Sequence, residues 1–217
     1  MSLLKVHAGL VALYGLRLFG FLFWRQTFQP GYDGMARLKA LDKTPPLKRT
    51  PIILSTAVFY ALMSAPLLYH FKAAPLVGLS ASVSKWGCVL AAFGLIYEAV
   101  ADQQKSLFKM KLRKEGRDDE LYTGGLYASS RHANYFGEMA FWLGSFIAGV
   151  PALFAPGVSI AAGLLRLVCA GLGLTGIFFI MLSATKRLEG KQAAKHRPSA
   201  WFDEYYINSN ALVPKLI

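Results

Sequence analysis

Five long apolar stretches dominate the pattern of hydrophobic and polar positions. They lie near residues 3–24, 51–70, 76–100, 135–154 and 158–183. Each has about the 20 residues that a helix needs to cross the roughly 30 Å hydrocarbon core of a bilayer. The pattern therefore predicts an all-α fold, a polytopic transmembrane helical bundle with about five spans, formed as one integral membrane domain over residues 1–217.

The polar segments between these stretches differ in charge. Lysine and arginine cluster in residues 25–50, in residues 101–131 and in the tail after Ala184, whereas the turn after the second stretch holds only Lys72 and the turn after the fourth holds no basic residue. Basic loops are retained on the cytoplasmic side of a membrane. The alternation predicts an N-terminus outside, a cytoplasmic C-terminus and an active site that faces the cytoplasm.

Composition agrees with a membrane protein. The 217 residues are 54% hydrophobic and 17% charged, with a mean hydropathy of +0.38 and a net charge of +12. Because the basic residues lie between apolar stretches, we expect them to contact anionic lipid rather than nucleic acid. The two cysteines, Cys88 and Cys169, lie inside apolar stretches without a CxxC partner. This spacing indicates neither a disulfide framework nor a metal site.

The segment Leu121 to Glu138, LYTGGLYASSRHANYFGE, combines paired glycines with basic residues just before an apolar stretch. Such a loop at the start of a helix can offer backbone N–H groups and cations to an anionic cofactor. An ordinary interhelical loop facing lipid headgroups explains the same residues, and local chemistry leaves both readings open. The earlier GYDG segment, Gly31 to Gly34, is interpreted as a simple connection.

Several ionisable and polar residues fall near the cytoplasmic ends of the predicted spans, where burial is costly without polar partners or water. Glu98 and Asp102 are four residues apart, so a helix directs both carboxylates the same way. We therefore expect a polar cavity that opens to the cytoplasm and is closed by a loop over residues 105–131. Its members would be Arg17, Glu98, Asp102, Gln103, Gln104 and Glu138.

Four motifs carry a family resemblance: Glu98-x-x-x-Asp102-x-Gln104-Lys105, Gly125-Leu126-Tyr127, the run from Ser130 to Glu138, and the terminal segment from Tyr205 to Pro214. In this order and spacing they resemble the C-terminal domain of the membrane steroid 5-alpha-reductase family, in particular its bacterial-type branch, the domain of unknown function 1295 (DUF1295). The resemblance covers residues 98–217. Ala133 replaces the proline usual in that branch, and Ser129 stands where an aromatic residue is common.

The resemblance implies an NADPH-dependent reduction of an activated carbon–carbon double bond in a steroid-like or other lipid enone. It also implies a cofactor held by cations and by amide or carboxylate groups. Carried over by position, the cofactor-binding residues are Asp102, Lys109, Arg131, His132, Asn134, Tyr135, Glu138, Arg187, Lys191 and Tyr205. The acid that polarises the substrate carbonyl belongs to the family's N-terminal half, for which Glu98, Tyr14 and Tyr60 are candidates.

A second class stays open. The chain also resembles membrane methyltransferases that act on isoprenylcysteine or phospholipid amines, which share an RHPxYxG-like loop but use S-adenosylmethionine. Glu138 directly after Gly137, together with Asp102 and Gln104-Lys105, favours the reductase. A transporter or scaffold is less favoured, because the sequence has no evident internal repeat and its polar groups gather on one side. The expected partners are membrane lipids and a lipid-like substrate.

Overall fold

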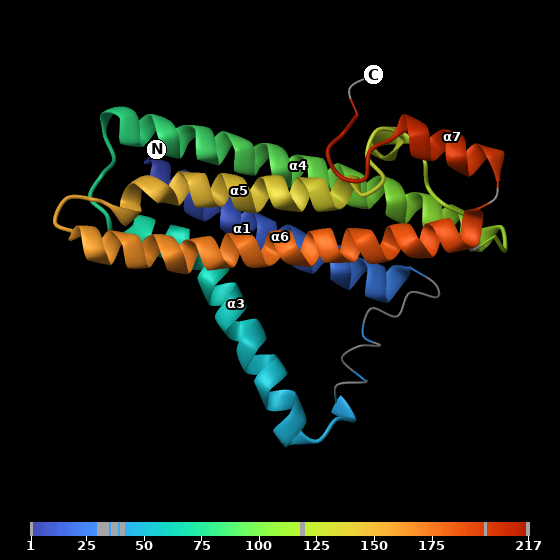
Figure 1. The fold of residues 1–217 in the computed structure, drawn as a ribbon, viewed down its shortest axis with the longest axis horizontal. Helices are drawn as coiled ribbons and strands as arrows, with labels where there is room; N and C mark the ends of the chain where they lie inside the picture. The colour runs from blue at the N-terminus through green and yellow to red at the C-terminus, as the bar shows by residue number, and fades with distance from the viewer. Residues whose placement is uncertain are drawn as a thin grey trace. The chain divides into compact units, whose positions relative to one another are not determined.

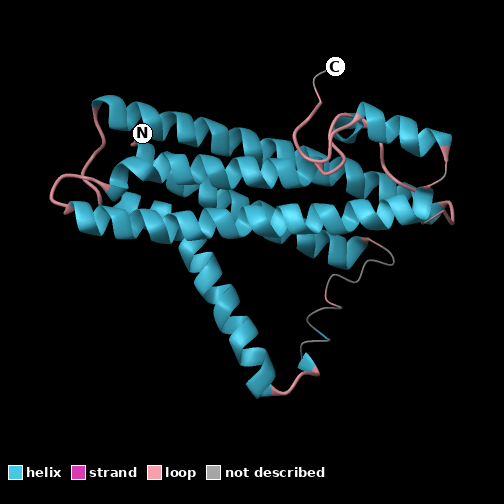
Figure 2. Cartoon of the chain, in the orientation of Figure 1, coloured by secondary structure: helices cyan, strands magenta, loops and turns pink. Residues whose placement is uncertain are grey.

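A computed structural model describes residues 2–29, 35, 39, 42–117, 120–197 and 199–215. Within these ranges the regular structure is helical, apart from one isolated β-bridge between Ser130 and Asn210 (Figures 1 and 2). The elements are α1 (Leu3–Phe28), α3 (Pro46–Lys72), α4 (Gly78–Lys114), the 3₁₀ helix η1 (Gly125–Ala128), α5 (Ala133–Leu153), α6 (Ile160–His196) and α7 (Ala200–Asn208). The GYDG segment lies outside the described residues.

Five of these helices, α1, α3, α4, α5 and α6, are long and apolar enough to cross a membrane. Large apolar side chains such as Phe19, Leu79 and Leu165 are exposed on them. A water-soluble protein would bury such side chains, whereas lipid tails solvate them. The prediction of an all-α fold with five spans is confirmed.

Helices α4 and α6 are longer than a bilayer requires. Each has 37 residues, or about 55 Å at 1.5 Å per residue. The expected loop over residues 105–131 is therefore wrong in its first part, because α4 continues to Lys114. Residues 101–114 are mostly good helix formers with no glycine or proline. The hydropathy pattern marked the end of the apolar stretch, not the end of the helix.

The chain divides into two compact units. Unit 1 contains Met1–Cys88 and Ser145–Gly176, and unit 2 contains Val89–Gly144 and Ile177–Ile217. Helices α4, α5 and α6 each contribute one part to each unit. The predicted cofactor-binding residues all belong to unit 2.

Small residues set the helix packing in both units. In unit 1, a Cβ on Gly149 would lie 2.5 Å from Pro66 of α3. In unit 2, a Cβ on Gly137 would lie 2.6 Å from the backbone nitrogen of Glu98. Helices in lipid associate through such close backbone contacts. The Gly137 contact fixes α5 against α4 at the level where the polar residues of both helices begin.

Candidate functional site

Tyr127 is the centre of a polar cluster in unit 2. It ends up 1% exposed within η1, and its hydroxyl donates to Oδ1 of Asn134 at 3.2 Å. The preceding turn requires glycine, because Gly125 has a φ of +57° and a Cβ there would lie 2.5 Å from the Gln104 side chain. Gln104 Oε1 also accepts from the backbone N–H of Leu126 at 3.0 Å. These contacts hold η1 against α4.

One face of α4 supplies the charged groups of this cluster. Glu98, Asp102, Lys105 and Lys109 follow one another at spacings of three or four residues, which places them on the same side of the helix. The Lys105 ammonium lies 5.2 Å from the centre of the Tyr127 ring, and Lys109 Nζ donates to the backbone oxygen of Glu120 at 2.7 Å. The α4 cations therefore follow the loop that leads to η1.

Burial and the negative charge of Asp102 raise the pKa of Tyr127, and the nearby phenols of Tyr205 and Tyr135 add to the shift. The hydroxyl consequently stays protonated and remains a hydrogen-bond donor to Asn134. Because this bond occupies Oδ1, the amide NH₂ of Asn134 faces away from Tyr127. It has no hydrogen-bond partner among the residues that the structure describes.

Arg131 and Glu189 form a buried clamp beside the cluster. Arg131 Nε and Nη2 lie 2.8 Å and 2.7 Å from Glu189 Oε2, and Nη1 donates to the backbone oxygens of Tyr206, at 3.1 Å, and Ser209. The guanidinium carbon also lies 3.8 Å from the centre of the Tyr206 ring. His132 Nε2 lies 2.7 Å from the other oxygen of Glu189. The clamp ties the start of α5 to α6 and to the C-terminal tail.

The backbone of the loop is paired with the tail. Arg131 N donates to Asn210 O at 2.9 Å, His132 N to Ala211 O at 3.0 Å, and Asn210 N to Ser129 O at 3.1 Å. Figure 1 shows this tail returning next to the yellow-green segment that precedes α5. Protein acceptors therefore occupy the backbone N–H groups of Arg131 and His132, and these pairings hold the end of the loop against the tail.

The structure brings four of the predicted cofactor-binding residues together around Tyr127: Asp102, Asn134, Tyr135 and Tyr205. Tyr205 reaches the cluster through its hydroxyl, which donates to the backbone oxygen of Tyr127 at 2.8 Å. Glu138 follows Asn134 by four residues on α5, so both side chains lie on one face of that helix. Lys109 is further along the same face of α4 as Asp102.

Arg131 and His132 adjoin this group through the clamp, and the ring centre of His132 lies 5.5 Å from that of Tyr135. The remaining predicted residues lie elsewhere. Arg187 and Lys191 are exposed on α6, each two residues from Glu189 and hence about 200° around the helix from it. Glu98 is buried against Gly137 in unit 2. Tyr14, which is 6% exposed, and Tyr60, which is 59% exposed, belong to unit 1.

Sequence reasoning missed the central roles of Tyr127 and Glu189. Tyr127 belongs to the Gly125-Leu126-Tyr127 motif, but the sequence predicted functions for residues that surround it in the structure and not for Tyr127 itself. Glu189 had a weaker signal, as the one acid within the basic segment from Lys186 to Arg197. An acid at that point of a helix otherwise covered by cations indicates a specific partner.

A pocket of about 510 Å³ lies between the loop before η1 and the α6–α7 connection. Its lining residues are Glu120, Leu121, Thr123, Lys195, His196 and Trp201. A shallower pocket of about 320 Å³ shares Thr123 and Trp201 with it and reaches Tyr205. Trp201 is 47% exposed, and its ring centre lies 5.3 Å from that of His196. An exposed indole near a lysine can receive an aromatic group that carries negative charge.

Two buried polar atoms of α6 add to this picture. Thr185 Oγ1 and Gln192 Oε1 have no hydrogen-bond partner within the described part of the chain. They share one face of α6 with Glu189, because the three positions are spaced by four and three residues. Buried polar groups normally have a partner, so this face of α6 has unused capacity for a polar ligand.

The fold and the polar cluster define a polytopic, all-helical membrane protein. A family model described as "Protein of unknown function (DUF1295)" matches residues 4–206, and the chain therefore belongs to this family. The match begins far ahead of the predicted region 98–217, so it also takes in α1 from residue 4 and all of α3, and it ends at residue 206. The comparison with curated proteins finds no match, and neither does the comparison with solved structures.

Proposed function

We propose that the protein is an NADPH-dependent membrane reductase that acts on an activated carbon–carbon double bond in a steroid-like or other lipid enone. The observation that carries the proposal is the Asn134 side chain, which Tyr127 orients at 3.2 Å and whose amide NH₂ remains available. An oriented amide of this kind can donate to a carboxamide or ribose oxygen. Asp102 and Glu138 can accept from ribose hydroxyls on either side of it.

The distribution of charge supports NADPH over S-adenosylmethionine. NADPH carries phosphates, whereas S-adenosylmethionine carries a sulfonium cation and no phosphate. Lys105 and Lys109 follow the η1 loop on α4, and Lys195 and His196 line the pocket that Trp201 borders. Cations bind phosphate oxygens by charge-assisted hydrogen bonds. We assign Lys105 and Lys109 to the diphosphate, and Lys195 and Trp201 to the adenosine phosphate end.

When bound, NADPH would supply a hydride to the substrate double bond. The chain's own residues would bind the cofactor, exclude water and deliver one proton. Glu98 remains a candidate for this acid because it is buried one helical turn from Asp102. Tyr14 is a candidate within unit 1, whereas the exposed position of Tyr60 makes it the least favoured of the three.

Ligand-dependent thermal stability of the detergent-purified protein tests the cofactor. NADPH, NADH and S-adenosylmethionine are compared in one concentration series. A ligand that binds only the folded state stabilises it by about 2.7 kcal/mol at 100 times its Kd. We expect a rise in Tm with NADPH. A selective rise with S-adenosylmethionine would replace the reductase by the methyltransferase, and no rise with any nucleotide would refute the site.

Two variants test whether the NADPH-dependent rise in Tm depends on Asn134. Asn134→Ala should abolish most of the NADPH-dependent rise. The substitution also removes the acceptor of the buried Tyr127 hydroxyl, so the ligand-free Tm should fall as well, and the response is measured as the rise from each variant's own ligand-free Tm. Gln103→Ala is the matched control, because the structure exposes this amide on α4, whereas the sequence predicted it inside the polar cavity. Equal NADPH responses in both variants would contradict the assignment of Asn134. With NADPH binding established, lipid enones are then screened for consumption of NADPH.

A further inference from the structure

A second polar group is buried in unit 1, among residues to which the sequence assigned no role. His7 of α1, His70 of α3 and Ser145 of α5 are 0%, 3% and 2% exposed. Ser145 Oγ lies 2.9 Å from His7 Nε2, and His7 Nδ1 lies 3.2 Å from His70 Nδ1. The three side chains therefore form one hydrogen-bonded chain across three helices.

The direction of this chain follows from the need to satisfy the buried serine hydroxyl. His7 is the hydrogen-bond partner of Ser145 Oγ within the described residues. The hydroxyl hydrogen must therefore point to His7 Nε2, since leaving it unpaired in the interior is costly. His7 Nδ1–H then donates to His70 Nδ1. In this tautomer His70 carries its remaining proton on Nε2, which has no acceptor within the described chain.

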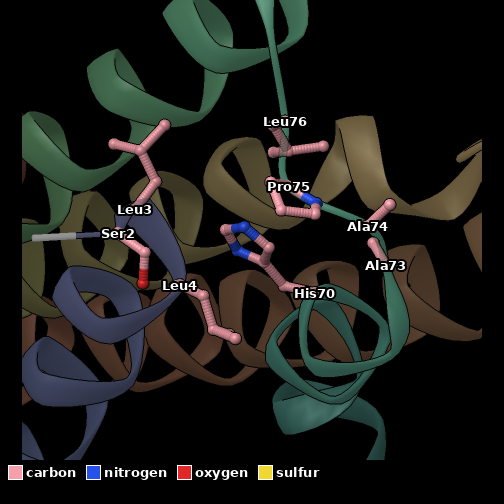
Figure 3. Close-up of a pocket in the computed structure, with 8 residues that line it drawn as sticks. All are labelled: Ser2, Leu3, Leu4, His70, Ala73, Ala74, Pro75 and Leu76. Carbon is pink, nitrogen blue, oxygen red and sulfur yellow. The ribbon is translucent and has the colours of Figure 1, made fainter.

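His70 borders a pocket of about 260 Å³. Figure 3 shows its ring directed into the space between the start of α1 and the turn that joins α3 to α4. Apart from Ser2 and His70 the lining is apolar: Leu3, Leu4, Ala73, Ala74, Pro75 and Leu76. The pocket thus combines one oriented N–H donor with apolar walls, as small-molecule sites do.

We infer that this pocket binds the carbonyl group of a lipid-like molecule, with the carbonyl oxygen accepting from His70 Nε2–H. A carbonyl is a strong acceptor on an otherwise apolar body, which matches the lining. The pocket lies where α1 begins and α3 ends, and helix ends of this kind meet the interfacial region of a bilayer. Phospholipid ester carbonyls occupy that region. A free ketone of similar size offers the same chemistry.

Imidazole nitrogen NMR of the ¹⁵N-histidine-labelled protein tests the site. The chain has four histidines, and the variants His7→Asn and His70→Asn assign the two signals of interest. The protein is reconstituted in nanodiscs of diester phospholipid or of the matched diether phospholipid, which lacks the carbonyls. Acetophenone is then titrated into the diether sample, with ethylbenzene as the control of similar shape without an acceptor.

We expect a protonated Nε2 on His70. A His70 Nε2–H signal that differs between diester and diether nanodiscs identifies the bilayer ester as the ligand. A signal that is the same in both but moves with acetophenone and not with ethylbenzene identifies a free carbonyl compound. An unprotonated Nε2, or a His70 signal that responds to neither the ester nor the ketone, overturns the proposal.

Ser145→Ala separates the hydrogen-bonded chain from the pocket itself, because Ser145 does not line it. Losing the donor frees His7 to change tautomer, so the population with a proton on His70 Nε2 should fall and acetophenone should bind about fivefold more weakly. Ser84→Ala is the control, since Ser84 is also buried in unit 1 and its hydroxyl has no hydrogen-bond partner among described residues. It should leave both the tautomer and the affinity unchanged. The test involves no nucleotide and is independent of the proposed reductase activity.

Discussion

Arg131 and His132 come from the segment that resembles a cofactor loop, yet the contacts of both side chains are with the protein itself. Glu189 accepts from Arg131 through one oxygen and lies 2.7 Å from His132 Nε2 through the other. The pair of Arg131 and Glu189 is 6% and 13% exposed at the side chains. At the residue scale, Arg131 and His132 of the most distinctive sequence motif therefore tie the start of α5 to α6 through Glu189.

Replacing Glu189 by alanine should destabilise the protein more than replacing an exposed acid by alanine. The substitution leaves a buried guanidinium without its counter-charge, which costs about 3 kcal/mol or more. Thermal unfolding in detergent should register a large fall in Tm, and limited proteolysis should cut the tail after α6 first. Glu204→Ala, an exposed acid on α7, is expected to be close to wild type. Equal Tm values for the two variants would exclude the clamp.

The half-buried Tyr205 predicts a dependence of stability on alkaline pH. Burial raises the pKa of Tyr205 to about 12, with the charge of Arg131 opposing the shift and that of Glu189 adding to it. An unfolded tyrosine ionises near pH 10. Between pH 10 and 12 the folded state therefore binds more protons than the unfolded state, and the free energy of unfolding falls as pH rises.

The Tm of the wild-type protein should accordingly drop across this window, and Tyr205→Phe should show a shallower drop because it lacks the ionising group. The comparison between the two proteins cancels the titration of the lysines. Parallel Tm profiles from pH 9 to 12 would contradict a Tyr205 that stays protonated in the folded state.

At the element scale, the sequence predicted where helices exist better than where they end. Apolar stretches located all five spans, because the bilayer imposes a minimum length that the hydropathy pattern records. The same pattern could not predict that α4 continues from Val100 to Lys114, since a helix outside lipid needs only helix-forming residues. It also could not predict the clamp, because Arg131 and Glu189 are 58 residues apart and no local pattern records that pairing.

Of the predicted site residues, some lie together in the structure and others do not. Asp102, Asn134 and Tyr135 were predicted together because their motifs follow one another along two adjacent helices, α4 and α5. Arg187 and Lys191 were predicted from their position in the family resemblance and their charge, and the turn of α6 places them about 200° from Glu189. The direction of a side chain on α6 depends on which residue anchors the helix to its neighbours. That residue is Glu189, which was not predicted.

Gly137 provides a test of the α4–α5 contact. Its position inside the Asn134-Tyr135-Phe136-Gly137-Glu138 motif suggests a ligand role, but a Cβ there would lie 2.6 Å from the Glu98 backbone nitrogen. Gly137→Ala should push the helices apart and cost about 1–3 kcal/mol, seen as a lower Tm without any ligand. Gly190→Ala on α6, where a Cβ would have nothing within 4 Å, should be neutral or stabilising. A tolerated Gly137→Ala would contradict the packing.

At the scale of the whole molecule, the charge pattern and the five spans together predict the membrane topology. Three candidate spans, α4, α5 and α6, separate the α3–α4 turn from α7, and three crossings predict that the turn and α7 lie on opposite sides of the membrane. The positive-inside tendency of the basic segments predicts the cytoplasm for the α7 side. The NADPH proposal depends on this orientation, because the Tyr127 cluster, η1 and α7 belong to the same unit.

Thiol labelling with a membrane-impermeant maleimide decides the orientation. In a background with Cys88 and Cys169 replaced by alanine, single cysteines are placed at the exposed positions Ala74, Pro156 and Asn208. Ala74→Cys and Pro156→Cys, on the α3–α4 and α5–α6 turns, should react in intact cells, whereas Asn208→Cys should react only after permeabilisation. The reverse pattern would invert the molecule and remove the cluster from cytoplasmic NADPH. Labelling of Ala74→Cys and Asn208→Cys from one side would contradict three spans between them, and with them the five-span fold.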